Sequence, residues 1–293
     1  FVASQLRRQT VEVRERNLTD EELIEFRGAK GKEVKNYIQS HCFKLLPPES
    51  QNVDAVGMRW VLTWKLIPPE DRQEAVQDAR SNKETVHTSD GLKKAKARIV
   101  LLGYEHPELG SSDYKTSSPV QSVIARNLLY QNVCQHDWFL EGLDLATAFL
   151  QTAPTSADAR LWTSGVAELR EALQVGPESI MRIQRNIYGS TTAPRGLWND
   201  VSATFSRLGG HRLVGDNSFW VWTEENEQPR NPADRFRVIG FVGGHVDDFN
   251  RGGDLENPKW LEVRRQIDEA YKWGTMKEDV FRHTGVDVSV NTK

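Results

Sequence analysis

Three aspartates offer the clearest candidate chemistry in the sequence. Asp144 lies between Leu143 and Leu145 in a short apolar stretch, and Asp247 and Asp248 are neighbours after another apolar stretch. A carboxylate among apolar residues, or beside a second carboxylate, is costly unless a cation neutralises it. Magnesium prefers carboxylate oxygens and keeps coordination positions for phosphate and water. Three carboxylates from two segments therefore predict a site for two magnesium ions and phosphoryl transfer or hydrolysis.

Two other readings of these carboxylates stay open at this point. Adjacent aspartates are frequent in solvated surface turns, so Asp247 and Asp248 alone do not require a metal. A two-metal nuclease would use similar aspartates, although such sites usually add a glutamate from a helix. Degradation of nucleic acid that depends on magnesium would favour the nuclease.

The elements that must position the aspartates alternate along the chain in an order that includes hairpins. Strands are predicted over residues 58–66, 94–102, 139–145, 180–188, 218–223, 235–242 and 285–290. Helices are predicted over 118–134, 194–208 and 258–273, and one or two short helical turns over 21–39, broken at Gly28 and Gly31. This order predicts an α+β fold whose antiparallel sheet is covered by helices on one face.

A basic strand provides the clearest candidate surface for phosphate. Lys94, Lys96 and Arg98 alternate with small or apolar residues, which places the three cations on one face of a strand. Paired with the strand at 58–66, they form a predicted hairpin with a basic face. The formal net charge is −3, so we expect any binding of nucleic acid to be local.

Composition excludes several classes of protein. The 293 residues contain two cysteines, Cys42 and Cys134, without histidine partners at metal-ligand spacing, so neither a disulfide scaffold nor a zinc site is expected. There is no apolar run long enough to span a bilayer and no secretory signal at the N-terminus. We therefore expect no membrane partner and a cytoplasmic, reducing location. Residues 1–20 are polar and mixed in charge, which predicts a linker or an N-terminal extension.

Four motifs, in the same order, resemble those of copia-type retrotransposon reverse transcriptases. Residues 143–150 resemble the first catalytic motif of that family, and residues 245–248 resemble its aromatic-Val-Asp-Asp motif. Residues 187–198 resemble its Leu-Tyr-Gly-Leu-Lys-Gln-x-Pro-Arg-x-Trp segment, and residues 96–104 its Lys-Ala-Arg-Leu-Val-x-x-Gly-Tyr. The resemblance extends from about residue 21 to residue 288, and several motifs in order are more specific than any one of them.

The resemblance implies a polymerase shaped like a right hand, with fingers and palm formed by residues 21–293. Its implied activity is RNA-directed DNA synthesis: nucleotidyl transfer from a dNTP to a primer 3'-hydroxyl with two magnesium ions. The implied partners are an RNA or DNA template–primer, a dNTP and the rest of a Pol polyprotein. We expect the thumb and ribonuclease H regions to lie outside this chain.

The resemblance also assigns roles to the carboxylate site. Asp144 and Asp247 would bridge the two metals, and the Leu145 carbonyl would be a further ligand. Asp248 would be a weaker or transient ligand. All three aspartates are thus candidate catalytic residues, and all four residues are candidate metal ligands.

Five further residues are implied to bind the nucleotide. Lys96 and Arg98 would reach the triphosphate, where arginine can bind phosphate in a bidentate manner. Phe149 would abut the sugar and exclude a 2'-hydroxyl, while Tyr188 and Gly189 would line the pocket. From the sequence alone, the two cations could instead form a solvated strand face, which is the less favoured reading, and core packing accounts for Phe149 about as well as contact with a sugar.

Departures from the family pattern sustain a rival of another class. The family usually has Lys and Gln after Tyr-Gly-Leu, whereas this chain has Ser190, Thr191 and Thr192, so a positive charge near the nucleotide is missing. Residues 243–244 are glycines and residues 250–251 are Asn and Arg where apolar residues are expected, which predicts a weakened hairpin. The alternative is a catalytically decayed, retrotransposon-derived domain that binds nucleic acid without chemistry.

Overall fold

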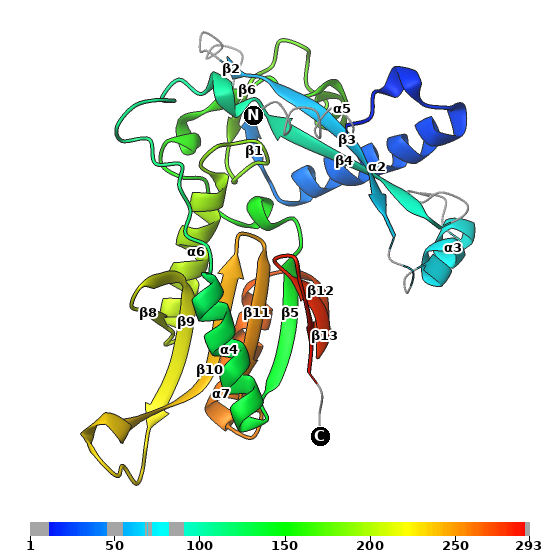
Figure 1. Ribbon diagram of the computed structural model, residues 1–293. Coiled ribbons are helices and arrows are strands. Elements are labelled where there is room, and N and C mark those ends of the chain that lie inside the picture. Colours follow the sequence, from blue (N-terminus) through cyan, green and yellow to red (C-terminus); the bar gives the residue numbers. More distant parts are fainter. Residues whose placement is uncertain (1–11, 46–54, 68, 70–71, 82–90, 291–293) are drawn as a thin grey trace. The chain divides into compact units, whose positions relative to one another are not determined.

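The computed structural model describes residues 12–45, 55–67, 69, 72–81 and 91–290. The chain forms two compact units (Figure 1): unit 1 comprises Phe1–Tyr114 and Ser156–Thr191, and unit 2 comprises Lys115–Thr155 and Thr192–Lys293. Each unit mixes helices with antiparallel strands. In these described ranges, no helix is long and apolar enough to cross a membrane. Of the predicted linker over 1–20, residues 1–11 lie outside the described part.

Unit 1 combines a long hairpin, a small sheet and helices. In chain order its elements are η1 (Glu15–Asn17), α2 (Asp20–Gln39), β1 (Phe43–Leu45), β2 (Ala55–Val56), β3 (Met58–Leu66), α3 (Arg72–Ser81), β4 (Lys93–Leu101), η4 (Gly103–Glu105), η6 (Asp158–Arg160), β6 (Trp162–Thr163), α5 (Ala167–Ala172) and β7 (Met181–Ile183). The hairpin pairs β3 with β4 from Met58↔Leu101 to Leu66↔Lys93, which confirms its prediction. The strand predicted over 180–188 is confined to β7, and α3 was not predicted.

Helix α2 corrects the prediction of short helical turns. It runs unbroken through Gly28 and Gly31 because its core face is apolar and its start is well capped. Thr19 accepts a hydrogen bond from the Glu22 backbone, and the Glu22 side chain accepts one from the Thr19 backbone, which forms a capping box. Phe26 packs against the hairpin, so tertiary contacts outweigh the low helix propensity of two glycines.

Unit 2 is built on a six-stranded antiparallel sheet with the order β12-β5-β11-β10-β9-β8. Its elements are α4 (Val123–His136), β5 (Phe139–Leu145), η5 (Ala148–Gln151), α6 (Ala193–Arg207), β8 (His211–Leu213), β9 (Asp216–Glu225), η7 (Pro232–Arg235), β10 (Phe236–His245), β11 (Asp248–Gly253), α7 (Pro258–Ala270), β12 (Trp273–Glu278), β13 (Val280–His283) and β14 (Val286–Ser289). Strand β5 has the predicted bounds, and β13 and β14 form a separate hairpin.

Helices cover both faces of this sheet, which corrects the prediction of one covered face. Helices α6 and α7 pack on one face around Trp220 and Trp222, and α4 packs on the other around Phe219 and Phe241. In Figure 1, α4 crosses in front of the strands and α7 lies behind them. The reason is that β9 carries large apolar side chains at successive positions, so both of its faces need cover.

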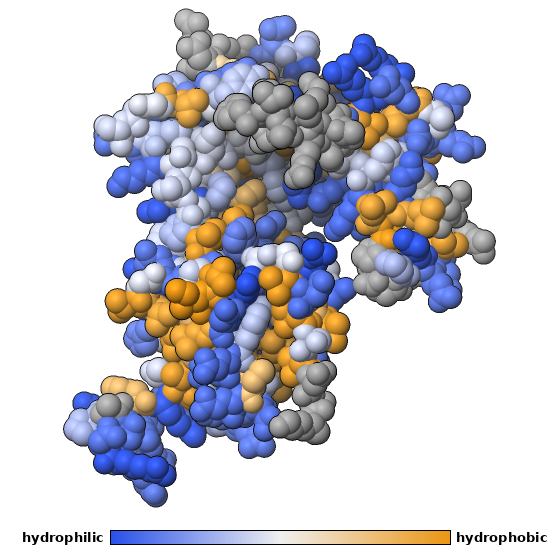
Figure 2. All heavy atoms as spheres, in the orientation of Figure 1, coloured by the Kyte–Doolittle hydropathy of each residue, from blue (hydrophilic) through white to orange (hydrophobic). Residues whose placement is uncertain are grey.

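Helix α4 also begins later than predicted. Ser122, rather than Ser118, is its N-cap and accepts a hydrogen bond from the Ala125 backbone. The core contacts therefore come from Ala125, Leu129 and Val133. Val123 and Ile124 are 61% and 82% exposed, and apolar side chains gather on the surface over the start of this helix (Figure 2).

Candidate active site

The three aspartates lie at one end of the unit 2 sheet. Asp144 on β5 and Asp248 on β11 are direct partners in the antiparallel ladder, so their side chains leave the same face of the sheet. Asp247 lies in the turn between β10 and β11, and its carbonyl accepts a hydrogen bond from Leu145 N over 2.9 Å. Residues far apart in the sequence are thus brought together by strand pairing.

The environment of Asp144 differs from the sequence-based expectation. Leu143 and Leu145 point into the core shared with α6 and α7, whereas Asp144 points to the opposite face and is exposed. Strand alternation therefore removes the burial cost that was inferred from the apolar neighbours. The prediction that a cation must neutralise a buried Asp144 was therefore wrong. Its role now depends on the other carboxylates nearby.

The turn that carries Asp247 has unusual backbone geometry. His245 and Asp248 pair across it, which leaves Val246 and Asp247 as its two central residues. Val246 has a φ of 62°, a conformation that is strained for a β-branched residue and that glycine usually occupies in such a turn. The Val246 side chain packs against the core behind the sheet, and this packing helps to hold the strained turn.

Asp248 is held by the hairpin of β13 and β14. Its Oδ1 lies 3.2 Å from Nδ1 of His283, and its Oδ2 accepts a hydrogen bond from Thr284 N, also over 3.2 Å. These partners of Asp248 were not predicted. A motif His-Thr-Gly is typical of a turn, but spacing alone cannot show that the turn reaches another strand.

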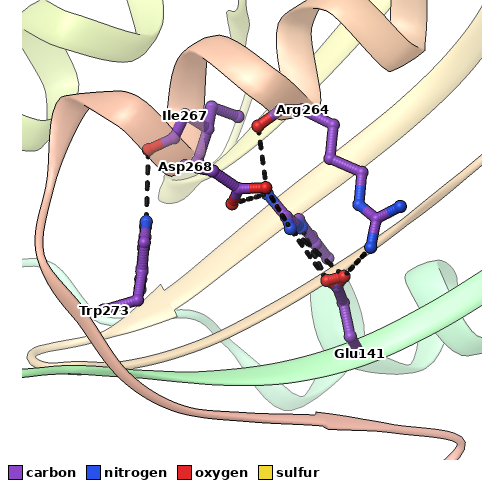
Figure 3. Close-up of polar contacts among 6 residues, drawn as sticks. Glu141, Arg264, Ile267, Asp268 and Trp273 are labelled. Carbon is purple, nitrogen blue, oxygen red and sulfur yellow. Dashed lines mark hydrogen bonds and ion pairs between the residues drawn. The ribbon is translucent and has the colours of Figure 1, made fainter.

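A buried ion-pair network supports the strands that carry the aspartates (Figure 3). Arg251, paired with Glu141 across β11 and β5, donates to both carboxylate oxygens over 2.9 and 3.1 Å. Arg251 also donates to Asp268 over 2.7 Å, and Arg264 donates to Glu141 over 2.8 Å. Because Arg251 is fully paired, its place in β11 does not weaken the hairpin. The ladder between β10 and β11 is continuous from the pair Gly240↔Gly253 to the pair His245↔Asp248.

The carboxylates suit magnesium by chemical type, but they do not converge completely. Carboxylate oxygens are the hard ligands that magnesium prefers, and three of them lie at the end of two paired strands. Within the described ranges, however, no three His, Cys, Asp or Glu side chains are arranged to hold a metal ion. The Asp248 carboxylate is instead directed toward His283 and Thr284 of the β13–β14 hairpin.

The remaining predicted residues of unit 2 flank the aspartates along the chain. Leu145 is buried, pairs with Trp273 on β12 and donates its N–H to Asp247. Phe149, on η5, is half-buried and packs against the core of unit 2. Both residues are therefore held by core packing beside the aspartate segment.

Two of the four nucleotide-binding candidates of unit 1, Arg98 and Tyr188, contact each other, and Gly189 lies against the same strand. Lys96 and Arg98 share one face of β4, as predicted. The Arg98 guanidinium lies 4.9 Å from the centre of the Tyr188 ring, and the Tyr188 carbonyl accepts a hydrogen bond from Leu101 N over 2.7 Å. Gly189 has a φ of 86°, and a Cβ there would lie 2.3 Å from the Leu101 carbonyl oxygen. Only glycine allows this approach of backbone to β4.

Ser190 and Thr191, which follow Gly189, form hydrogen bonds within unit 1. The Ser190 hydroxyl donates to Asp158, and the Thr191 hydroxyl lies 2.6 Å from that of Tyr114. Nε2 of His106, another buried side chain, lies 3.3 Å from Asp158. These contacts fix the segment next to Tyr188 without providing the positive charge that the resembled motif has there.

Comparison with known proteins finds retrotransposon relatives. The chain is similar to two retrovirus-related Pol polyproteins of Arabidopsis thaliana, from transposons RE2 and RE1, with 28% and 27% identity. Each match covers 227 residues, which is 76% of this chain and 13% of the relative. No family model matches the chain. The similarity supports a region of a retrotransposon Pol polyprotein, and this chain spans about an eighth of the length of these relatives.

Proposed function

We propose that this chain is the fingers and palm of an RNA-directed DNA polymerase of an LTR retrotransposon, of copia type. The observation that carries the proposal is the grouping of Asp144, Asp247 and Asp248 at one end of an antiparallel sheet. The motif order and the similarity to retrotransposon Pol polyproteins support the same reading. In this proposal unit 2 is the palm and unit 1 the fingers, and a cytoplasmic location is part of it.

The turn at Val246 adds physical support. A β-branched residue in the left-handed region costs about 1–3 kcal/mol, and such conformations cluster at active sites. With this turn conformation, Asp247 lies next to the end of β5, where its carbonyl accepts a hydrogen bond from Leu145 N. A relaxed turn would present this carboxylate differently.

The proposed chemistry is nucleotidyl transfer to a primer 3'-hydroxyl. Two magnesium ions, when bound, would assist ionisation of the attacking hydroxyl and stabilise charge on the leaving phosphate. Asp144 and Asp247 would hold these ions. Phe149 would pack beside the sugar of the incoming nucleotide and disfavour a 2'-hydroxyl.

Unit 1 would bind the triphosphate and the base. Arg98, oriented by the Tyr188 ring, would donate to phosphate oxygens together with Lys96 on the same strand face. The missing side chain of Gly189 gives room to the β4 backbone, so Gly189 would line the nucleotide pocket only through its own backbone beside Tyr188. Ser190 and Thr191 contribute no charge, and we therefore expect a high KM for dNTP.

The test is incorporation of dNTP on a primed RNA template in magnesium, comparing the parent with Asp247→Asn. Loss of a metal-binding carboxylate should lower the rate at least about 100-fold. Asp137→Asn is a matched control, because it makes the same change at an exposed helix end whose φ of 51° asparagine tolerates. Circular dichroism must show that all three proteins are folded.

The same assay separates the alternatives. A folded parent that binds primer–template but incorporates no nucleotide would support the decayed nucleic-acid-binding domain and contradict the polymerase. Magnesium-dependent degradation of the template without synthesis would support a nuclease. Equal incorporation by the parent and Asp247→Asn would exclude the assigned aspartates.

A further inference from the structure

We propose that Asp248 is a positioning residue rather than a metal ligand: its carboxylate fastens the β13–β14 hairpin to β11, directly beside the turn that carries Asp247. We call this set of contacts the Asp248 latch, and it comprises Asp248, His283, Thr284 and Gln121. The statement that Asp248 does not bind metal rests on the proposed function. The latch itself depends only on contacts within unit 2.

Both carboxylate oxygens of Asp248 face the hairpin. Oδ1 lies 3.2 Å from His283 Nδ1, and Oδ2 accepts the backbone N–H of Thr284 over 3.2 Å. To bind magnesium, this carboxylate would have to give up the Thr284 hydrogen bond on Oδ2 or turn Oδ1 away from the buried His283 ring. Asp144 and Asp247 are then the carboxylates that bind metal.

The histidine that contacts Asp248 is fixed from its other side. His283 is fully buried, and its Nε2 lies 3.2 Å from the Gln121 side-chain oxygen. Gln121 N in turn donates to the Gly244 carbonyl on β10 over 2.8 Å. The latch thus connects the β13–β14 hairpin to both strands that flank the Asp247 turn.

Glycine at position 243 makes room for this arrangement. A Cβ on Gly243 would lie 1.9 Å from the Gln121 side-chain nitrogen, which no side chain tolerates without displacing Gln121. This glycine was expected to weaken the strand, yet its missing side chain gives Gln121 the space from which it contacts His283. The departure from the resembled motif and the latch are therefore parts of one arrangement.

The turn of the β13–β14 hairpin is shaped for these contacts. Thr284 and Gly285 have φ values of 48° and 81°, which directs the Thr284 N–H toward Asp248. Arg126 on α4 donates to the Thr284 hydroxyl over 2.7 Å, and Phe281 packs so closely over β5 that a Cβ on Gly142 would lie 2.5 Å from its ring. Apolar packing holds the hairpin to the sheet, and the latch fixes its turn next to the aspartates.

The first arm of the test measures metal binding with Mn²⁺, by electron paramagnetic resonance, in the full chain with primer–template. We expect Asp144→Asn and Asp247→Asn each to weaken Mn²⁺ binding at least about tenfold, through loss of a charged ligand. Asp248→Asn should match the parent and the Asp137→Asn control within about twofold. A loss for Asp248→Asn as large as that for Asp247→Asn would overturn the proposal.

The second arm tests the latch without any metal. In a double-mutant cycle of urea unfolding, Asp248→Ala and His283→Gln should be non-additive by about threefold or more in the unfolding constant. Asp137→Asn and His283→Gln should be additive. Additive effects of Asp248→Ala and His283→Gln would overturn the latch.

A third measurement needs only one substitution, in case the His283 variant does not fold. Arg282 is exposed in the hairpin, so trypsin cleavage after it reports hairpin opening. Cleavage should be faster in Asp248→Ala than in the parent, and an unchanged rate would contradict the latch. If the parent binds no Mn²⁺, the proposed metal site fails, while the unfolding and proteolysis results still decide the latch.

Discussion

Substitution of Glu141 by glutamine should destabilise unit 2 more than any surface change, because it leaves a buried arginine partly unpaired. Arg251 and Glu141 have side chains that are 1% and 2% exposed. In the parent, Glu141 accepts from Arg251 through two oxygens and from Arg264 through one of them. Glutamine keeps one acceptor oxygen, adds an N–H group that faces a guanidinium, and removes the charge.

The magnitude follows from what Arg251 retains. Removing one partner of a buried ion pair costs about 3–5 kcal/mol, because the remaining charge stays in a site without water. Arg251 keeps its contact with Asp268, whose side chain is 36% exposed and therefore screened by solvent. We accordingly expect the lower end of the range, about 3 kcal/mol, for Glu141→Gln.

The assay is urea unfolding followed by tryptophan fluorescence and circular dichroism, since Trp220, Trp222 and Trp260 lie in the core of unit 2. A loss of about 3 kcal/mol should lower the midpoint by about 1 M urea. Glu262→Gln is the matched control, because Glu262 binds Arg265 on the exposed surface of α7. We expect no measurable change for that control.

A double replacement refines the argument. Glu141→Met with Arg251→Met removes both charges and keeps apolar volume, so it should be less destabilising than Glu141→Gln alone. A single variant as stable as the parent, or a double variant clearly worse than the single one, would refute the reasoning. The first result would mean that water reaches Arg251, and the second that the pair is needed for the packing of α7.

Two further predictions concern stability. Burial raises the pKa of Glu33 above its usual 4.5, so the native state holds a proton that the unfolded chain releases, and stability should fall as pH rises from about 4.5 through the raised pKa. Glu33→Gln can still accept a hydrogen bond from the Ile99 N–H, but it has no proton to release, so the fall in stability should disappear. The measurement is the free energy of unfolding of both proteins from about pH 4.5 to 7.5. If the free energies of parent and variant changed in parallel with pH, the prediction would be wrong. Leu129→Ala, at a fully buried position of α4, should cost about 3 kcal/mol, whereas Ile124→Ala, at a position 82% exposed, should change stability by less than about 0.5 kcal/mol. Equal losses in urea unfolding would show that the predicted register of this helix, rather than the observed one, is right.

The strands could be predicted because their patterns are local. Lys96 and Arg98 alternate with buried alanines, and β4 follows this period of two along its length. The segment of β5 around Asp144 was recognised by its apolar residues and has the predicted bounds. Alternation, applied to Asp144 itself, would also have predicted its exposure, because its neighbours occupy the opposite face.

The helices were harder to predict, because tertiary packing determines where they begin and end. Gly28 and Gly31 are poor helix formers, yet α2 continues through both since Phe26 and its capping box outweigh them. In α4, the apolar residues at the start suggested the wrong core face. The N-cap at Ser122 is fixed partly by Asp216, which accepts the Ser122 N–H over 2.8 Å from a distant strand.

The candidate site combined predictable and unpredictable parts. The positions of Asp144 and Asp247 at one sheet end were expected from the resemblance, and strand pairing brings them there. Neither His283 nor Gln121 could be linked to Asp248, because those contacts depend on how a separate hairpin and a loop before α4 pack. Long-range side-chain contacts of this kind leave no periodic signal in a single sequence.

The departures from the resembled motif are matched by partners within unit 2. Gly243 gives space to Gln121, and Arg251 is paired with Glu141 on the neighbouring strand. Random decay would leave a buried arginine without a carboxylate, at a cost of several kcal/mol in a marginally stable protein. The polar and glycine positions of β10 and β11 therefore belong to a consistent arrangement, and a hairpin of this kind still presents Asp247 in a strained turn. The unusual residues of this hairpin therefore support the turn rather than disrupt it, and because a domain without activity would keep the same packing, the choice between the two functions falls to the dNTP incorporation assay.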